Sequence, residues 1–284
     1  MDRLVSIASL RARLDHARRG GQRIALVPTM GALHEGHLAL VDVARREADL
    51  VVMSVFVNPR QFAPGGDFDR YPRDLDADSA LAAGRGVDVL FAPPVDEMYS
   101  RGTEIVVTAG ETAARWEGAF RPGHFDGVLT VVSKLFNIVQ PDVACFGRKD
   151  IQQVTLIRRM VEELDIPVQL AVVPTVRDAD GLAMSSRNSY LSAPERQAAL
   201  AIPRSLAALA TAWGDGLREA AALGEVAANV LRQEPTLVTD YIAVAHPDRL
   251  APTEVADPGT VIALAARVGT TRLIDNTILG ENEF

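Results

Sequence analysis

Two histidines, His34 and His37, stand three positions apart in the segment "PTMGALHEGH". The segment follows a short apolar run at residues 24–29, and the apolar spacing after it predicts a helix that begins near Gly36. A helix that begins directly after a strand directs free backbone N–H groups and the positive end of its dipole to the carboxyl edge of the sheet, where anions bind. Residues three apart share a helix face, so both histidines could reach one phosphate. The alternative is that they cap the helix or pack at its start.

The spacing of these histidines disfavours a metal site. Zinc proteases have two histidines four residues apart with a glutamate directly after the first, and a single cysteine, Cys145, allows neither an internal disulfide nor a four-thiolate zinc site. The alternating aspartates of residues 74–78 resemble a calcium loop, but Ser79 and Arg85 stand where such a loop requires glycine and glutamate. We interpret these aspartates as the acidic first turn of a helix, and Cys145 as a buried strand residue rather than a nucleophile.

Lysine is rare in this chain. Only two of the 29 basic residues are lysines, Lys134 and Lys149, and the other 27 are arginines. A lysine kept in such a chain indicates a need for a compact ammonium ion rather than a planar guanidinium. Lys149 lies in a predicted strand-to-helix turn, "GRKDIQQ", where it and Gly147 offer a second phosphate site. Lys134 lies within a predicted helix, and we expect it on a solvated face.

Two further loops carry polar residues that each have two interpretations. Asn58 and Gln61 of "FVNPRQF" follow a buried strand, at the edge where open α/β sheets bind ligands. They could hold a hydroxy acid, or Asn58 could only fix the loop before the proline. The loop "MSSRN", residues 184–188, has hydroxyls and an arginine that suit a triphosphate, but Ser185 or Ser186 could equally cap a helix.

The segment from residue 121 to residue 153 has the highest density of such side chains. Arg121 and His124 lie in one loop, where they could contact a ligand or simply tie the loop down. Gln152 and Gln153 open a helix, where polar residues also occur for capping reasons alone.

Buried strands alternate with amphipathic helices in the first part of the chain. Apolar runs predict strands at residues 24–29, 50–57, 87–93 and 141–147, and helices at 74–83, 127–139 and 150–164. This alternation predicts an α/β fold, a Rossmann-like doubly wound parallel sheet with helices on both faces.

The pattern changes near Pro174. Residues 174–186 indicate a strand, an Asp-Gly turn and a strand. An Ala-rich helical region at 194–231 follows, and then strand-like runs at 240–245, 261–268 and 271–279. We therefore predict two domains, a Rossmann-like domain at residues 1–175 and a smaller C-terminal α+β domain at residues 176–284.

The formal net charge of −8 disfavours a general nucleic-acid surface, which needs a basic face to neutralise phosphates. The N-terminal residues are charged throughout, and no apolar run approaches the ~18 residues that span a bilayer. These features predict a cytoplasmic protein that acts on small molecules rather than on nucleic acid or membranes.

Together, the motifs closely resemble those of the pantothenate synthetase (pantoate–beta-alanine ligase) family. "PTMGALHEGH", "FVNPRQF", "RPGHFDGVLTVVSKLFNIVQPD", "FGRKDIQQ" and "MSSRN" occur in the family's order, from about residue 5 to the C-terminus. The resemblance implies an ATP-dependent ligase that condenses pantoate with beta-alanine to pantothenate, a precursor of coenzyme A. It implies a pantoyl-adenylate intermediate and release of pyrophosphate and then AMP. It also implies a fold shared with nucleotidyltransferases and class I tRNA synthetases, a requirement for Mg²⁺ and a homodimer whose smaller domain closes over the site.

The resemblance also assigns site residues. His37 would be the catalytic histidine, with His34 and Lys149 beside it on the phosphates. Gln61, Gln153 and Asn58 would bind pantoate, with Gln61 also placed where beta-alanine arrives. The ATP-binding residues would be Met30, Gly31, His34, His37, Gly147, Lys149, Asp150, Val176, Met184, Ser185, Ser186 and Arg187. The magnesium ligands are left unassigned.

Two other classes of protein share part of this pattern. A nucleotidyltransferase of the same superfamily has the histidine motif but releases a nucleotidylated product, and a non-catalytic nucleotide-binding regulator could use the same fold. The segments "RPGHF" and "FGRKDIQQ" favour the ligase. A tRNA synthetase is disfavoured by the acidic charge.

Overall fold

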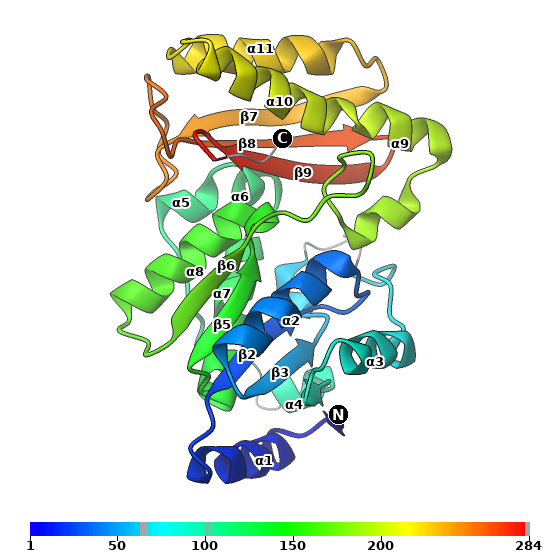
Figure 1. Ribbon diagram of the computed structural model, residues 1–284, viewed down its shortest axis with the longest axis vertical. Helices are drawn as coiled ribbons and strands as arrows, with labels where there is room; N and C mark the ends of the chain where they lie inside the picture. The colour runs from blue at the N-terminus through cyan, green and yellow to red at the C-terminus, as the bar shows by residue number, and fades with distance from the viewer. Residues whose placement is uncertain (63–67, 100–101, 103, 282–284) are drawn as a thin grey trace. The chain divides into compact units, whose positions relative to one another are not determined.

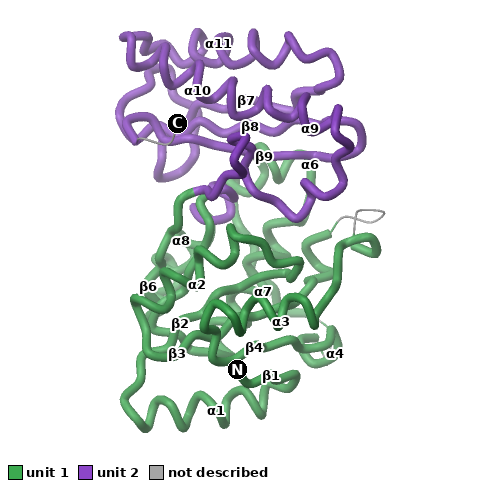
Figure 2. The backbone as a smooth tube through the Cα atoms, turned by 45° about the vertical axis from the view of Figure 1, so that its right-hand side comes forward, with its two compact units in different colours: residues 1–148, 156–174 green, residues 149–155, 175–284 purple. Residues whose placement is uncertain are grey.

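The computed structural model describes residues 1–62, 68–99, 102 and 104–281. The chain divides into two compact units, shown in Figure 2: unit 1 comprises residues 1–148 and 156–174, and unit 2 comprises residues 149–155 and 175–284. The sequence prediction placed residues 149–155 in the first domain, whereas here they group with unit 2.

Unit 1 is built on a six-stranded parallel sheet in the order β1-β4-β3-β2-β5-β6. Figure 1 labels the strands β2, β3, β5 and β6 of this sheet. The strands are β1 (Asp2–Leu4), β2 (Ile24–Thr29), β3 (Leu50–Val55), β4 (Val89–Phe91), β5 (Val143–Gly147) and β6 (Gln169–Val173). The chain runs outward from β2 through β3 to β4 and then returns to β5 on the other side of β2. The strand order therefore reverses between β2 and β5, where open α/β sheets bind their ligands at the carboxyl ends of the strands.

Helices cover both faces of this sheet. The helices up to residue 163 are α1 (Ile7–Arg19), α2 (Glu35–Glu47), α3 (Leu75–Gly84), α4 (Val95–Met98), α5 (Glu111–Ala114), α6 (Glu117–Phe120), α7 (His124–Val139) and α8 (Ile151–Glu163), of which α2 and α7 pack on the central strands. On β5, Cys145 lies in the cluster that includes Val41 of α2, whereas the ring of Phe146 lies 6.4 Å from that of Phe136 in α7. Because successive strand residues point to opposite faces, both faces are buried, and β5 is apolar at each position from Val143 to Phe146.

Over its described residues from 175 onward, unit 2 combines a three-stranded antiparallel sheet, β7 (Leu237–Ala245), β8 (Val261–Val268) and β9 (Thr271–Ile278), with three α-helices. The helices are α9 (Ala193–Ala199), α10 (Ala201–Gly214) and α11 (Ala220–Arg232). Leu206 and Leu209 of α10 share a buried cluster with Ile262 and Leu264 of β8, so the helices supply the core of this unit.

The predicted Rossmann-like α/β class and the smaller α+β part are confirmed. Two element predictions were wrong in detail. α7 begins at His124 rather than at 127, directly after Gly123 in a left-handed conformation (φ 78°). The expected strands around the Asp-Gly turn form only an isolated bridge between Arg177 and Ala183. The predicted Ala-rich helical region is confirmed and comprises three helices, the first of which is capped by Ser192 and Glu195.

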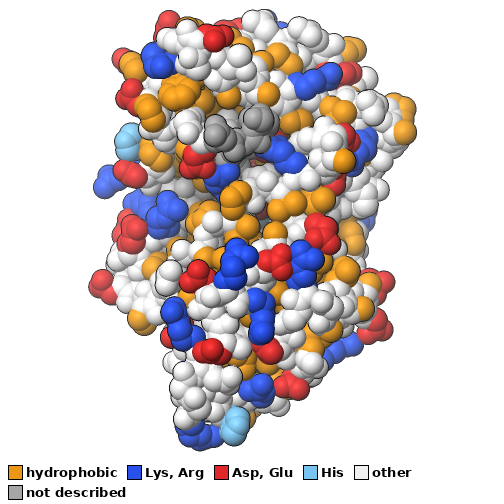
Figure 3. All heavy atoms as spheres, viewed as in Figure 1, with side chains coloured by type: hydrophobic (Ala, Val, Ile, Leu, Met, Phe, Trp, Pro, Cys, Tyr) orange, Lys and Arg blue, Asp and Glu red, His pale blue; other side chains and the backbone are white. Residues whose placement is uncertain are grey.

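Lys and Arg side chains are interspersed with Asp and Glu side chains over the face shown in Figure 3. Among the described residues, no helix is long and apolar enough to cross a bilayer.

Candidate active site

The two histidines of the opening motif begin α2 and contact each other. His34 is the N-cap residue, and its Nδ1 accepts from the backbone N–H of Gly36 at 3.1 Å. His37 completes a capping box, because its Nδ1 accepts from the backbone N–H of His34 at 3.3 Å. The two rings lie with their centroids 4.1 Å apart.

This capping geometry determines where the imidazole protons lie. A nitrogen that accepts from a backbone N–H cannot itself carry a proton, so each neutral ring is protonated at Nε2. Each ring therefore has an N–H donor on the edge away from the helix backbone. The two interpretations of these histidines are compatible, since Nδ1 caps the helix while Nε2–H has the chemistry to bind an anion.

The turn before the histidines is held by a buried carboxylate. Asp78, only 3% exposed, accepts from the backbone N–H groups of Ala32 at 3.0 Å and Leu33 at 2.8 Å. Gly31 has a φ of 85°, and a Cβ at that position would lie 2.7 Å from Asp78 Oδ2. The sequence placed Asp78 correctly in the first turn of α3, which begins at Leu75. Its role in the turn gave no sequence signal, because its partners lie 45 and 46 residues away.

The second loop, at the end of β3, centres on Asn58 and Gln61. Asn58 is 1% exposed, and its Nδ2 donates to Gln61 Oε1 at 3.1 Å and to the carbonyl of Gly127 at 3.0 Å. Because Oε1 of Gln61 accepts this bond, its Nε2 is oriented the other way and lies 2.8 Å from Met30 Sδ. The fold thus brings the "FVNPRQF" and "PTMGALHEGH" loops together.

Arg121 and His124 hold the same loop by its backbone. Arg121 donates to the carbonyl of Gln61 at 3.2 Å, and His124 Nδ1 donates to that oxygen at 2.7 Å. His124 therefore carries its proton on Nδ1, and its Nε2 can accept from Arg121 at 3.3 Å. Both residues tie the loop down, one of the two interpretations that the sequence left open.

Sequence reasoning missed Tyr99, which lies against this loop. Its hydroxyl donates to Asn58 Oδ1 at 2.8 Å, and burial raises the pKa of Tyr99 to about 12, so the phenol is a stable donor. Lys134, expected on a solvated face, is half-buried, and its ammonium lies 5.7 Å from the centre of the Tyr99 ring. That expectation was wrong because the Lys134 ammonium forms a cation–π interaction with the Tyr99 ring.

Within unit 2, the predicted site residues, which comprise the nucleotide residues and Gln153, lie on three segments. Lys149 is in the short 3-10 helix η2 (Arg148–Asp150), and Gln153 is half-buried in the first turn of α8. The carbonyl of Val176 accepts from the backbone N–H of Met184 at 2.9 Å. Ser185 caps the 3-10 helix η3 (Ser186–Tyr190) by accepting from the backbone N–H of Arg187 at 3.3 Å, so the capping interpretation of Ser185 is correct.

Two observations limit the chemistry. Cys145 is a buried strand residue, as the sequence predicted, and this burial raises the pKa of its thiol to about 12, which disfavours the thiolate that a nucleophile requires. Among the described residues, no group of three or more His, Cys, Asp or Glu side chains could hold a metal ion.

Comparison with known proteins identifies the family of the chain. A family model described as pantoate-beta-alanine ligase matches residues 3–278. Pantothenate synthetase of Rhizobium etli is 51% identical over 277 residues, which cover 98% of this chain and 93% of that protein. Pantothenate synthetase of Moorella thermoacetica is 50% identical over 283 residues, which cover 100% of both.

Solved structures agree. Pantothenate synthetase from Thermus thermophilus superimposes with a TM-score of 0.93 at 48% identity, covering 98% of this chain and 99% of that one. Pantoate-beta-alanine ligase from Francisella tularensis, solved in complex with beta-gamma ATP and beta-alanine, has a TM-score of 0.81 at 34% identity, covering 98% and 97%. The chain therefore belongs to the pantoate–beta-alanine ligase family.

Proposed function

We propose that this protein condenses pantoate with beta-alanine at the expense of ATP, through a pantoyl-adenylate that forms with release of pyrophosphate and reacts with release of AMP. The observation that carries the proposal is the whole-length match to the ligase family, whose Francisella tularensis relative was solved with beta-gamma ATP and beta-alanine. The two Nε2–H donors at the start of α2 supply the chemistry that such a reaction needs.

In the first half-reaction, a carboxylate oxygen of pantoate attacks the α-phosphorus of ATP, and the bond to the bridging oxygen of pyrophosphate breaks. This displacement between anions depends on positioning and positive charge rather than on a covalent nucleophile. We assign His37 and His34 as donors to the phosphate oxygens, with Lys149 and Arg187 offsetting the charge of the leaving pyrophosphate.

In the second half-reaction, the amine of beta-alanine attacks the acyl carbon of the adenylate. An amide bond forms, the acyl–phosphate bond breaks, and AMP leaves with the electron pair while the amine loses a proton. Gln61, Gln153 and Asn58 are assigned to pantoate. Because Asn58 occupies Oε1 of Gln61, the Gln61 amide offers its N–H groups, which suit the oxygen atoms of a hydroxy acid.

Further groups are assigned to the nucleotide by the family resemblance. The remaining ATP-binding assignments are Met30, Gly31, Gly147, Asp150, Val176, Met184, Ser185 and Ser186. At Gly147, the carboxyl end of β5, an added Cβ would meet no protein atom within 4 Å, which suits close approach of a ligand.

We further propose that Mg²⁺ enters with the nucleotide. The described residues offer no cluster of acidic or histidine ligands, which fits an ion carried mainly by phosphates and water rather than by a protein cage. When bound, it supplies neutralisation of phosphate charge. The proposal also includes a cytoplasmic location, in keeping with the single cysteine of the chain. It further includes a homodimer, which the family resemblance implies.

One assay separates this function from its alternatives. Protein, ATP and Mg²⁺ are incubated with pantoate, with and without beta-alanine, and pyrophosphate, AMP and pantothenate are measured. A ligase releases AMP and pantothenate only when the amine is present. A nucleotidyltransferase would release pyrophosphate and retain a stable nucleotidylated product, and a regulator would bind ATP without turnover.

A further inference from the structure

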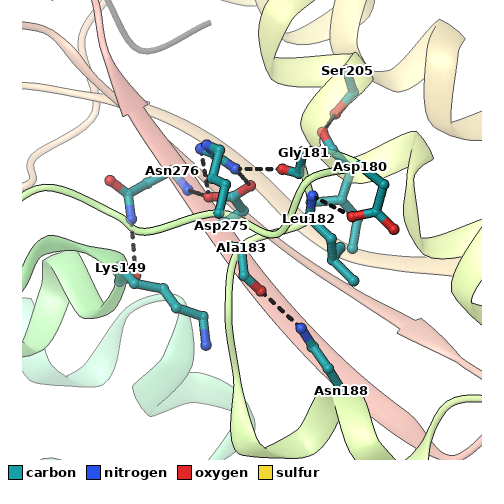
Figure 4. A network of polar contacts seen from close by, with 11 residues as sticks. Lys149, Asp180, Gly181, Leu182, Ala183, Asn188, Ser205, Asp275 and Asn276 are labelled. Carbon is teal, nitrogen blue, oxygen red and sulfur yellow. Dashed lines mark hydrogen bonds and ion pairs between the residues drawn. The ribbon is translucent and has the colours of Figure 1, made fainter. Parts of the chain in front are cut away.

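Two adjacent buried residues of β9, Asp275 and Asn276, have polar side chains that contact segments outside the sheet. Asp275 is 2% exposed and Asn276 is 0% exposed. Asp275 forms a two-point ion pair with Arg177, at 2.7 and 3.2 Å, and accepts from the backbone N–H of Asn276 at 2.8 Å. Asn276 Nδ2 donates to the backbone carbonyl of Lys149 at 2.8 Å (Figure 4).

Burial of the Asp275–Arg177 ion pair and the Asn276 amide costs free energy of desolvation, so these residues stabilise a sheet poorly compared with apolar ones. A buried ion pair loses the hydration of both charges, and well-packed apolar residues of similar volume are often as stable or more so. A buried amide likewise requires partners for its polar atoms. The neighbouring strand β8 is buried and apolar from Val261 to Ala266, so the sheet itself does not require polar residues at this level. The polar side chains of Asp275 and Asn276 are therefore explained by their contacts with other segments rather than by the stability of the sheet.

Those segments are the ones assigned to the nucleotide. Through Asn276, β9 holds the Lys149 turn by its carbonyl. Through Asp275 it holds Arg177, which also donates to the carbonyl of Gly181 at 3.2 Å. Arg177 and Ala183 form an antiparallel bridge, and the next residue, Met184, begins the "MSSRN" loop.

The Asp275 carboxylate of β9 also interacts with Lys149 through its charge. Burial raises the pKa of Asp275 above its ordinary value, opposed by the Arg177 guanidinium and, more weakly, by the Lys149 ammonium. The Lys149 ammonium therefore interacts electrostatically with the Asp275 carboxylate. The backbone carbonyl of Lys149 accepts from the side chain of the adjacent residue, Asn276.

We propose that Asp275 and Asn276 are positioning residues, which hold the Lys149 turn and the 176–187 segment in the geometry required by a nucleoside triphosphate. The proposal rests on the proposed function and deepens it, since neither residue is placed in contact with substrate. A displacement of about 1 Å in a group that contacts phosphate can lower a rate by ~10²-fold, so a small shift of the turn is sufficient.

The test is a double-mutant cycle between Asn276 and Lys149, read out as the dissociation constant of a non-hydrolysable ATP analogue by calorimetry. Asn276→Ala removes the donor without adding charge, and Asn276→Leu restores volume if the alanine variant folds poorly. If Asn276 acts through Lys149, we expect Asn276→Ala to weaken analogue binding about tenfold in the parent and less than about threefold in the Lys149→Ala background. Thr277→Ala, which alters the next buried polar residue of β9, is the matched control and should bind normally.

Asp275→Asn is tested in parallel against Asp240→Asn. Asp240 has a side chain that is 1% exposed and pairs with Arg267 and Arg272, but it lies in β7. Both variants lose a buried charge, so both should lower the unfolding midpoint, but only Asp275→Asn should raise the KM for ATP while leaving the KM for beta-alanine within about twofold.

Two results would overturn the proposal. One is an equal loss of analogue affinity from Asn276→Ala in both backgrounds, or no loss in either. The other is an Asp240→Asn variant with the same ATP defect as Asp275→Asn, which would reduce the effect to sheet stability. Failure of the proposed function is distinguishable, because it would appear as a parent protein that releases no pyrophosphate from ATP and pantoate, whereas the analogue-binding cycle needs no turnover.

Discussion

The Nδ1 atom of His37 accepts a hydrogen bond from the backbone N–H of His34, so the side chain of the second histidine satisfies the backbone of the first. The same side chain thus contributes to the start of α2 and holds an Nε2–H donor in a fixed direction. A simple truncation of His37 would remove both contributions at once. Variants that keep the cap are needed to separate stability from chemistry.

His37→Glu is such a variant, because glutamate at the third helical position can also accept from the N-cap backbone N–H but has no donor when ionised. We expect its free energy of unfolding to lie within about 1 kcal/mol of the parent value. We expect it to form pyrophosphate at least ~10²–10³-fold more slowly, since a donor to developing phosphate charge is replaced by an acceptor. Chemical denaturation and single-turnover pyrophosphate release measure the two effects. Near-normal turnover in a folded variant would remove His37 from the catalytic step.

Gln61→Ala should weaken pantoate far more than ATP. The Gln61 amide is oriented by Asn58, and loss of its N–H groups leaves substrate oxygens without partners, an effect of about 10- to 100-fold in the KM for pantoate. Steady-state kinetics with each substrate varied in turn gives both constants. If the KM for ATP rises instead, the two substrates have been assigned to the wrong loops.

Lys149→Arg keeps the charge but replaces a compact ammonium with a wider planar group. We expect about a tenfold or greater loss in single-turnover pyrophosphate release, and little effect on the reaction of preformed pantoyl-adenylate with beta-alanine, which no longer moves the β- and γ-phosphates. Lys134→Arg is the matched control, since an arginine can also stack on the Tyr99 ring. A fully active Lys149→Arg protein, or equal loss in both half-reactions, would contradict the assignment to the triphosphate.

Gly31→Ala tests the turn that carries the histidines. The new Cβ would both adopt a positive φ and meet Asp78, whereas Gly21, with a φ of 74°, has no atom within 4 Å of the same position. Gly21→Ala should therefore cost about 1 kcal/mol of conformational strain alone. Gly31→Ala should cost about 2–4 kcal/mol, because the buried carboxylate must also move from its backbone partners, and it should lose most activity. Equal unfolding free energies for the two variants would mean that the contact with Asp78 is relieved without cost.

Much of the sheet could be predicted from the sequence because its strands are buried on both faces. β2, β3 and β5 are mainly apolar, with Thr29 at the end of β2 and Ser54 in β3 as the exceptions, and such runs are recognisable without any partner. The edge strand β6 is different: Gln169 is exposed, and the next three residues are only half-buried. The sequence did not predict this strand, although residues 170–173 are all apolar.

The candidate site divides in the same way. His34, His37, Asn58 and Gln61 could be found because each lies next to a strand end in a short motif. The residues that hold them could not, because their roles depend on contacts distant in sequence. Asn276, for example, reaches the carbonyl of Lys149 across 127 residues. No local pattern encodes such a contact, so only the fold reveals it.

The single cysteine, which is buried in the parallel sheet, allows local unfolding of that sheet to be measured by thiol labelling. Cys145 is 0% exposed in β5, and the chain has no other thiol. Any labelling by a thiol reagent must therefore follow an opening of the sheet around β5, and at low reagent reactivity its rate gives the population of that open state. A ligand that binds only the folded protein lowers this population by mass action. Substrate affinities can thus be read from the labelling rate of the unmodified chain, without turnover and without an added probe.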